Sequence, residues 1–128
     1  VWDYPGGGVE FMRAFWREAG ALDAQAAGLT EGSRFPFCTL EGLQGLATDA
    51  GLAAVEGTAI EAPTVFRNFD DYWRPFTLGA GPAPGYCASL APPVRETLRQ
   101  KLQDALPRDA DGSIALRTRA WAVKGRAK

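Results

Sequence analysis

The chain has 128 residues, of which 46% are hydrophobic and 23% are charged, a balance typical of one folded domain with a packed core and not of a disordered chain. Its formal net charge of -1 argues against a broad basic surface for nucleic acid. Two cysteines, Cys38 and Cys87, and no histidine exclude a disulfide scaffold and a histidine-based metal site.

No apolar run approaches the roughly 20 residues that cross a bilayer, and no signal peptide is visible. The sequence therefore predicts a reduced, cytoplasmic protein without a membrane partner. Basic residues gather near the end of the sequence, where we expect a solvated strand face and a frayed tail rather than a phosphate-binding surface. They are Arg117, Arg119, Lys124, Arg126 and Lys128.

The first predicted elements are a short strand and a helix. Residues 1–4 are rich in β-forming side chains and end at Pro5 and three glycines, which predict a strand followed by a flexible loop. Apolar side chains at helical spacing predict a helix over residues 9–19. Asp23 is a candidate N-cap for a short second helix through residue 27.

The middle of the sequence predicts a helix and a second strand. Residues 34–38 surround a proline and are expected to be extended. Thr39 fits the N-cap of a helix over residues 40–50. Residues 53–62 predict a strand that Pro63 ends.

The remaining elements alternate between helix and loop before a last strand. Asn68 begins a helical segment with acidic residues in its first turn. Residues 79–85 are a loop rich in glycine and proline, and residues 86–90 are a short helical turn. Two prolines start the clearest helix, over residues 92–106, and residues 113–124 alternate as a strand.

This order of elements predicts an α/β fold in which helices cover a small sheet of three strands, the whole of residues 1–128 forming one segment of a domain. A sheet of three strands is thin for this number of helices, and the sequence starts inside a strand. We therefore expect that further strands of the same sheet precede residue 1.

Motifs for catalysis and for cofactor binding are absent. Without histidine there is no Ser-His-Asp or Cys-His pair, and the glycines at 6–8 form neither GxGxxG nor a P-loop. Asp70 and Asp71 are adjacent, so on a helix their side chains diverge by about 100°. They suit the start of a helix better than a site of paired carboxylates.

Aromatic residues crowd into the first two-thirds of the sequence, whereas Trp121 is alone in the last part. Core packing explains many of them, and a cap over an apolar or planar substrate explains the excess equally well. In the second interpretation Arg34, Arg67 or Arg74 supplies charge at the rim of the substrate site.

Several segments occur in order along the sequence. They are Val1-Trp2-Asp3-Tyr4 with the glycines that follow, FMRAFW at 11–16, RFP at 34–36 before Thr39, AGL at 50–52, PTVFRNFDDYWRPF at 63–76 and AWAVKG at 120–125. Together they resemble the C-terminal portion of class I S-adenosylmethionine-dependent methyltransferases of the bacterial small-molecule type. The resemblance covers essentially all 128 residues, and its specificity lies in the order of the segments, since no single motif is diagnostic.

The resemblance implies that residues 1–4 are the fifth strand of a seven-stranded Rossmann-like sheet. The strand around Val55 is then the sixth, and residues 113–124 are an antiparallel seventh strand between them. It also implies S-adenosylmethionine as the cofactor of the intact enzyme. The cofactor-binding half of such enzymes would precede residue 1, so no cofactor-binding residue is assigned, and we expect residues 1–128 alone to be inactive and to bind the cofactor weakly or not at all.

Such enzymes contribute mainly by positioning the acceptor in line with the methyl group. The resemblance then implies that Trp2, Asp3 and Tyr4 face the reaction centre. Aromatic side chains from the neighbouring helices would form the wall of the acceptor pocket: Phe11, Phe15, Trp16, Phe69, Tyr72 and Trp73. Tyr4 and Trp16 are the first candidates for lining residues, and no catalytic base and no metal ligand is assigned.

The sequence thus predicts the substrate-side part of an enzyme that transfers a methyl group to a small-molecule acceptor. The alternative is a non-enzymatic α+β module, with an aromatic pocket, that binds a ligand or oligomerises. An unpaired edge of the sheet also predicts a homodimer.

Overall fold

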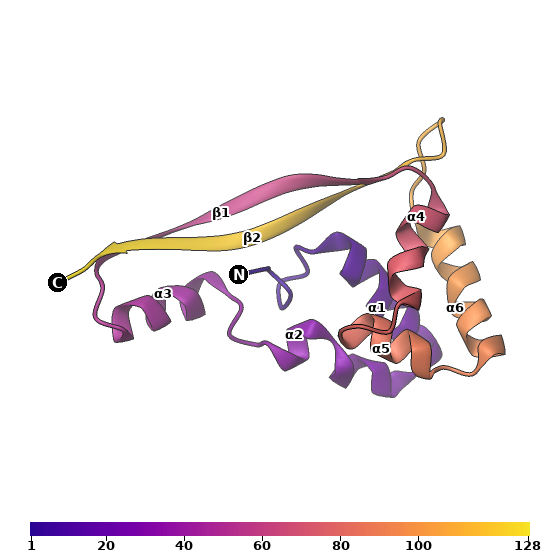
Figure 1. Ribbon diagram of the computed structural model, residues 1–128, viewed down its shortest axis with the longest axis horizontal. Helices are drawn as coiled ribbons and strands as arrows, with labels where there is room; N and C mark the ends of the chain where they lie inside the picture. Colours follow the sequence, from indigo (N-terminus) through magenta and orange to yellow (C-terminus); the bar gives the residue numbers. More distant parts are fainter.

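The computed structural model describes all residues from Val1 to Lys128. The fold is α/β, with the helices gathered on one side of a single two-stranded antiparallel sheet (Figure 1). None of the helices combines the length and the apolar character that crossing a membrane requires. In sequence order the elements are α1 (Glu10–Leu22), the 3-10 helix η1 (Ala24–Leu29), α2 (Glu31–Arg34), α3 (Leu40–Asp49), β1 (Ala53–Phe66), α4 (Phe69–Trp73), the 3-10 helix η2 (Arg74–Thr77), α5 (Pro82–Ser89), α6 (Pro92–Ala105) and β2 (Ile114–Arg126).

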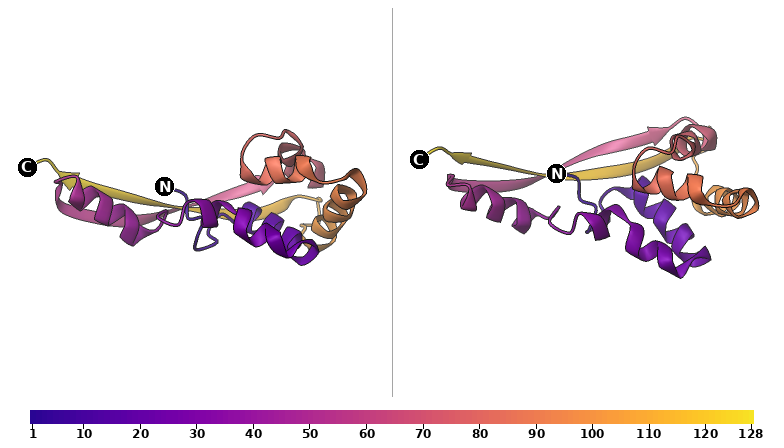
Figure 2. Two further views of the ribbon diagram at one scale, coloured as in Figure 1. Left: turned by 90° about the horizontal axis from the view of Figure 1, so that it is seen from below. Right: turned by 60° about the horizontal axis from the view of Figure 1, so that its bottom comes forward.

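The sheet is a long ribbon of two strands. β1 and β2 pair from Phe66 opposite Ile114 to Ala53 opposite Arg126. α3 packs under the end of the ribbon where β1 begins and β2 ends, and the other helices gather toward the opposite end (Figures 1 and 2). The second face of the ribbon carries no helix, so Val65 of β1 is 59% exposed.

The predicted first strand is wrong in its extent. Residues 1–4 form one isolated bridge to β2, at Trp2, and Val9 forms a second, so the sheet has two strands rather than the predicted three. Pro5 and the glycines after it turn the backbone before a ladder can form, with Gly7 at a φ of 72°. The segment still runs antiparallel to β2, which is therefore flanked by this segment on one side and by β1 on the other.

Two other predicted boundaries also differ. β1 continues through Pro63 to Phe66, although the proline was expected to end it. A proline is tolerated there because β1 has a neighbour on only one of its edges. α5 begins at Pro82 instead of near residue 86, because Gly81, at a φ of 94°, turns the backbone and a proline fits the first turn of a helix.

Three predicted helix starts are confirmed by their caps. The side chains of Asp23, Thr39 and Asn68 each accept a hydrogen bond, of 2.9 to 3.0 Å, from a backbone N–H two or three residues further on. The predicted alternation of the last strand is confirmed as well, since Ile114 and Leu116 of β2 are buried and the residue between them is exposed.

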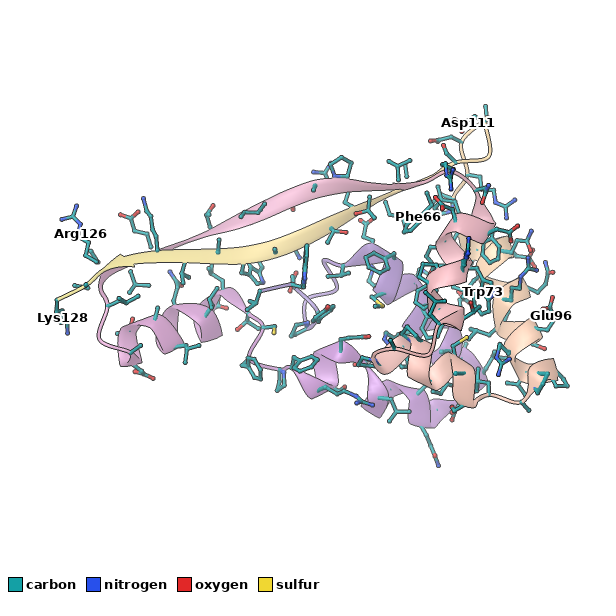
Figure 3. The ribbon with its side chains drawn as sticks, viewed as in Figure 1. Phe66, Trp73, Glu96, Asp111, Arg126 and Lys128 are labelled. Carbon is teal, nitrogen blue, oxygen red and sulfur yellow. The ribbon has the colours of Figure 1, made fainter.

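The core lies where the helices meet the end of the ribbon. A cluster of 16 buried residues joins α1, α4, α5, α6 and β2. Phe15 of α1 is fully buried and stacks on Phe76, with 4.5 Å between the ring centroids. Trp73 belongs to this cluster and Phe66, at the end of β1, packs against it (Figure 3). The core therefore fixes α1 relative to the ribbon.

Tyr72 is completely buried in this core and donates a hydrogen bond of 2.8 Å to the carbonyl oxygen of Phe11. Burial raises the pKa of Tyr72 well above its ordinary value. Below about pH 10 this side chain is protonated in both the folded and the unfolded protein. At higher pH only the unfolded protein loses the proton, so the free energy of unfolding is expected to fall by up to about 1.4 kcal/mol per pH unit.

Urea unfolding at a series of pH values up to about 11 measures this effect. Tyr72→Phe removes the titrating group and should flatten the alkaline part of the profile, at a cost of about 1 kcal/mol at neutral pH for the lost hydrogen bond. Tyr4 and Tyr86, whose pKa values burial also raises, titrate in both proteins and cancel in the comparison. Equal alkaline losses in the two proteins would contradict the prediction.

Candidate functional site

A cavity of about 500 Å³ lies between the loop after residues 1–4 and the helices α1 and α2. Tyr4 from the N-terminal segment, Met12 and Trp16 from α1, and Glu31 from α2 contribute to its wall. Figures 1 and 2 show the three segments next to one another. The volume falls within the roughly 300–1,000 Å³ of small-molecule sites.

Glu31 lines the cavity and is the first residue of the short helix α2. The Thr30 side chain accepts a hydrogen bond of 3.0 Å from the N–H of Ser33 and so caps the helix. Gly32 permits a close approach to the N-terminal segment, since a Cβ at this position would lie 3.2 Å from the carbonyl oxygen of Tyr4. A helix of four residues has no periodic pattern, so α2 and Glu31 are not predicted from the sequence.

The Glu31 carboxylate is buried, with only 3% of the residue exposed. One carboxylate oxygen accepts a hydrogen bond from the indole Nε1–H of Trp16, and the other accepts one of 3.3 Å from the backbone N–H of Ala83. No arginine, lysine or terminal amine forms an ion pair with it. Glu31 is therefore held by neutral donors and has no cation beside it.

Tyr4 adds a phenol group to the cavity wall. Burial raises the pKa of Tyr4, and the nearby Glu31 and Cys38 raise this pKa further. The hydroxyl therefore keeps its proton at neutral pH and can donate a hydrogen bond. The ring of Tyr4 lies 6.3 Å from that of Phe35, measured between centroids.

Two arginines of α1 lie at the rim of the cavity. Arg13 has a side chain that is 58% exposed and lies 3.9 Å from Glu10; Arg17 is 60% exposed and pairs with Glu18 at 3.2 Å. Both are screened by water, and each already has a carboxylate partner. The arginines that the sequence suggested for a rim do not line this cavity: Arg34, Arg67 and Arg74.

Asp3 is a second buried charge, next to the cavity but not part of its wall. Its Oδ2 accepts hydrogen bonds from Arg119 Nε at 2.8 Å and from Arg119 Nη2 at 2.6 Å, and its Oδ1 accepts one of 3.0 Å from the N–H of Gly6. Glycines leave room for this carboxylate, because a Cβ at Gly6 or at Gly8 would lie 2.5 Å from one of its oxygens. Asp3 thus ties the N-terminal segment to β2.

Arg119 corrects one expectation from the sequence. We predicted that it lies on a solvated strand face, but its side chain is only 34% exposed because Asp3 draws it inward. Its guanidinium also lies 5.2 Å from the centre of the Trp121 ring. The other basic residues of this region are exposed, as predicted: Arg117, Lys124, Arg126 and Lys128.

A substitution at Gly8 tests how rigidly the Asp3 and Arg119 side chains are held. In Gly8→Ala the new Cβ would lie 2.5 Å from Asp3 Oδ2 and 2.9 Å from Arg119 Cβ, so one side chain has to move. We expect a loss of about 1–3 kcal/mol in the free energy of unfolding, measured by urea denaturation. The matched control is Gly45→Ala in α3, where no atom lies within 4 Å and alanine should stabilise the helix by up to about 1 kcal/mol. If Gly8→Ala stabilised the protein as Gly45→Ala does, the Asp3–Arg119 pair would not be rigid.

The structure separates the residues that were predicted for the site. Tyr4 and Trp16 line the cavity, Asp3 lies beside it, and Trp2 is 52% exposed on the surface. The remaining predicted residues are packed in or against the helical core and do not line the cavity: Phe11, Phe15, Phe69, Tyr72 and Trp73. The structure thus brings two of the predicted side chains together with Glu31.

Comparison of the sequence and structure with protein-family models, with curated proteins and with solved structures finds no match. The structure contains no group of three or more cysteine or acidic side chains that could hold a metal ion. Cys38 and Cys87 are free and buried, and burial raises the pKa of the Cys87 thiol, which leaves it a poor nucleophile. The cavity wall offers a carboxylate, a phenol and an indole, from Glu31, Tyr4 and Trp16.

Proposed function

We propose that residues 1–128 are the substrate-side, C-terminal part of an S-adenosylmethionine-dependent methyltransferase, and that the cavity at Tyr4, Trp16 and Glu31 receives the small-molecule methyl acceptor. The position of the cavity carries the proposal. It lies against the loop that directly follows residues 1–4, the segment that bridges to β2. In open α/β sheets, ligands bind beyond the carboxyl ends of the strands.

The order of the extended segments supports the same proposal. β2 is antiparallel both to residues 1–9 and to β1, and it lies between them. This is the order that the methyltransferase resemblance implies for the last three strands of a Rossmann-like sheet. A self-contained hairpin would need no segment along the second edge of β2.

In the glycine-rich loop beside the cavity, the glycines at 6 and 8 lie against the Asp3 carboxylate, since a Cβ at either position would lie 2.5 Å from one of its oxygens. The proposal places the S-adenosylmethionine contacts outside residues 1–128. The contribution of these residues in the proposed enzyme is to bind the acceptor, orient it and shield it from water.

Isothermal titration calorimetry with S-adenosylmethionine tests the proposal. We expect no measurable heat from residues 1–128 alone, and saturable binding by the polypeptide extended upstream in its gene. Tight binding by residues 1–128 alone would overturn this division of roles. If the extended polypeptide binds none, the methyltransferase proposal itself fails.

One observation favours the alternative of a non-enzymatic ligand-binding module: residues 4–32 supply the whole wall of the cavity. In that case a ligand binds the cavity while the extended polypeptide does not bind S-adenosylmethionine.

A homodimer stays a prediction for either function, since β1 (Ala53–Phe66) has an unpaired edge. Sedimentation velocity over a range of concentrations measures it, and a monomer throughout would contradict it.

A further inference from the structure

The Glu31 carboxylate is a buried charge without a counter-ion. With only 3% of the residue exposed, water screens the charge poorly. Its two hydrogen bonds, from Trp16 and from the N–H of Ala83, occupy two of about four acceptor positions that a carboxylate offers. Buried charges in proteins are normally paired, and this one lacks a protein cation.

Glu31 is one of the residues that line the cavity. Trp16 and Tyr4 place aromatic side chains in the same wall, and aromatic faces attract a cation within about 6 Å of the ring centre. Tyr4 keeps its proton and so adds no charge of its own, which leaves Glu31 as the anionic group beside these rings. A carboxylate with aromatic neighbours is the combination that recognises an organic ammonium group.

We propose that the cavity binds the cationic nitrogen of a small amine, with the Glu31 carboxylate as its counter-ion and with Trp16 and Tyr4 beside it. The amine enters the position that no arginine or lysine of the protein fills. That the methyl acceptor is an amine rests on the proposed function. That the cavity binds an amine does not depend on the proposed function.

The rim arginines do not reverse this preference. Arg13 and Arg17 are more than half exposed and are paired with Glu10 and Glu18, so water and these carboxylates weaken their field inside the cavity. Glu31 acts from a buried position, where charge interactions are stronger. An anionic group placed next to Glu31 would be repelled.

Three probes of nearly equal shape test the inference on the 128-residue protein: phenethylamine, which is an ammonium ion at neutral pH, phenethyl alcohol and 3-phenylpropionate. Titrations are followed by NMR at the indole N–H of Trp16, which donates to Glu31. We expect saturable shifts with phenethylamine, at least tenfold weaker binding of the alcohol, and the weakest binding by the propionate. Equal binding of amine and alcohol, stronger binding of the propionate, or no saturable shift with the amine would each overturn the inference.

Glu31→Gln removes the charge and keeps one hydrogen-bond acceptor, so it should abolish the preference for the amine over the alcohol. The matched control is Glu41→Gln, which makes the same change at an exposed position in the first turn of another helix, α3, and should leave the preference intact. If Glu31→Gln unfolds the protein, as circular dichroism would reveal, the amine-to-alcohol ratio of the unmodified protein decides the question alone.

The outcomes separate this inference from the proposed function. Binding of the amine, combined with failure of the extended polypeptide to bind S-adenosylmethionine, keeps the amine site and removes the methyltransferase. Failure of the amine to bind, combined with binding of S-adenosylmethionine by the extended polypeptide, removes only the class of acceptor.

Discussion

Phe15→Ala is expected to lower the free energy of unfolding by about 3–5 kcal/mol, because it removes a large side chain from the core and leaves a cavity there. Phe15 is fully buried, stacks on Phe76 at 4.5 Å and meets the edges of Trp16 and Tyr86 at 5.2 and 6.3 Å between ring centroids. The free energy of unfolding of a small domain is roughly 5–15 kcal/mol in total, so the variant should unfold at a much lower urea concentration. Far-ultraviolet circular dichroism during urea titration measures the change.

Phe37→Ala is the matched control for this experiment, since Phe37 is 62% exposed. The same chemical change should then cost no more than about 0.5 kcal/mol. The pair also separates two interpretations of Phe15, which the sequence placed in the wall of the acceptor pocket and the structure places in the core. A loss of less than about 1 kcal/mol in Phe15→Ala would contradict the core position.

Arg119→Met is expected to cost about 2–4 kcal/mol, because it leaves the Asp3 carboxylate buried without its cation. The Asp3 side chain is 3% exposed and accepts two hydrogen bonds from Arg119, at 2.6 and 2.8 Å. The expected loss is toward the lower part of the range for buried pairs, since water reaches the 34% of the Arg119 side chain that is exposed. Urea unfolding gives the value.

Arg117→Met provides the control from the same strand, two residues away. Arg117 pairs with Glu61 at 3.1 Å, but the two side chains are 63% and 44% exposed, so the change should cost about 0–1 kcal/mol. Equal losses at the two arginines would show that the Asp3 pair contributes no more than a surface ion pair. In the variant at Arg119 we also expect the N-terminal segment to lose protection of its amide protons, because Asp3 no longer holds it against β2.

Local signals made much of the secondary structure predictable. Asp23, Thr39 and Asn68 are short polar side chains that satisfy the free N–H groups at a helix start, so each marks a helix boundary without help from distant residues. The alternation of Ile114 and Leu116 likewise follows from the geometry of a strand with one buried face. These patterns depend on neighbours within a few residues along the sequence.

Two predicted strand boundaries were wrong, for different physical reasons. Pro63 was expected to end a strand, and it is accommodated because β1 is paired on only one edge, which no local pattern reveals. Residues 1–4 have the side chains of a strand, but Pro5 and the glycines fold back over Asp3 and restrict pairing to single bridges. At Pro63 the arrangement of the sheet determined the structure, whereas at residues 1–4 the proline and glycines that follow the segment did.

The candidate site was likewise predictable only in part from the sequence. The sequence by itself determined an α/β protein with an excess of aromatic side chains near its loops, and it selected Tyr4 and Trp16, which line the cavity. Only the tertiary structure decided which aromatic residues are core, that Arg119 turns inward to Asp3, and that Glu31 is a buried carboxylate without a cation. The reason is physical: burial and charge pairing depend on residues far apart in sequence, such as Asp3 and Arg119, and periodicity carries no information about such pairs.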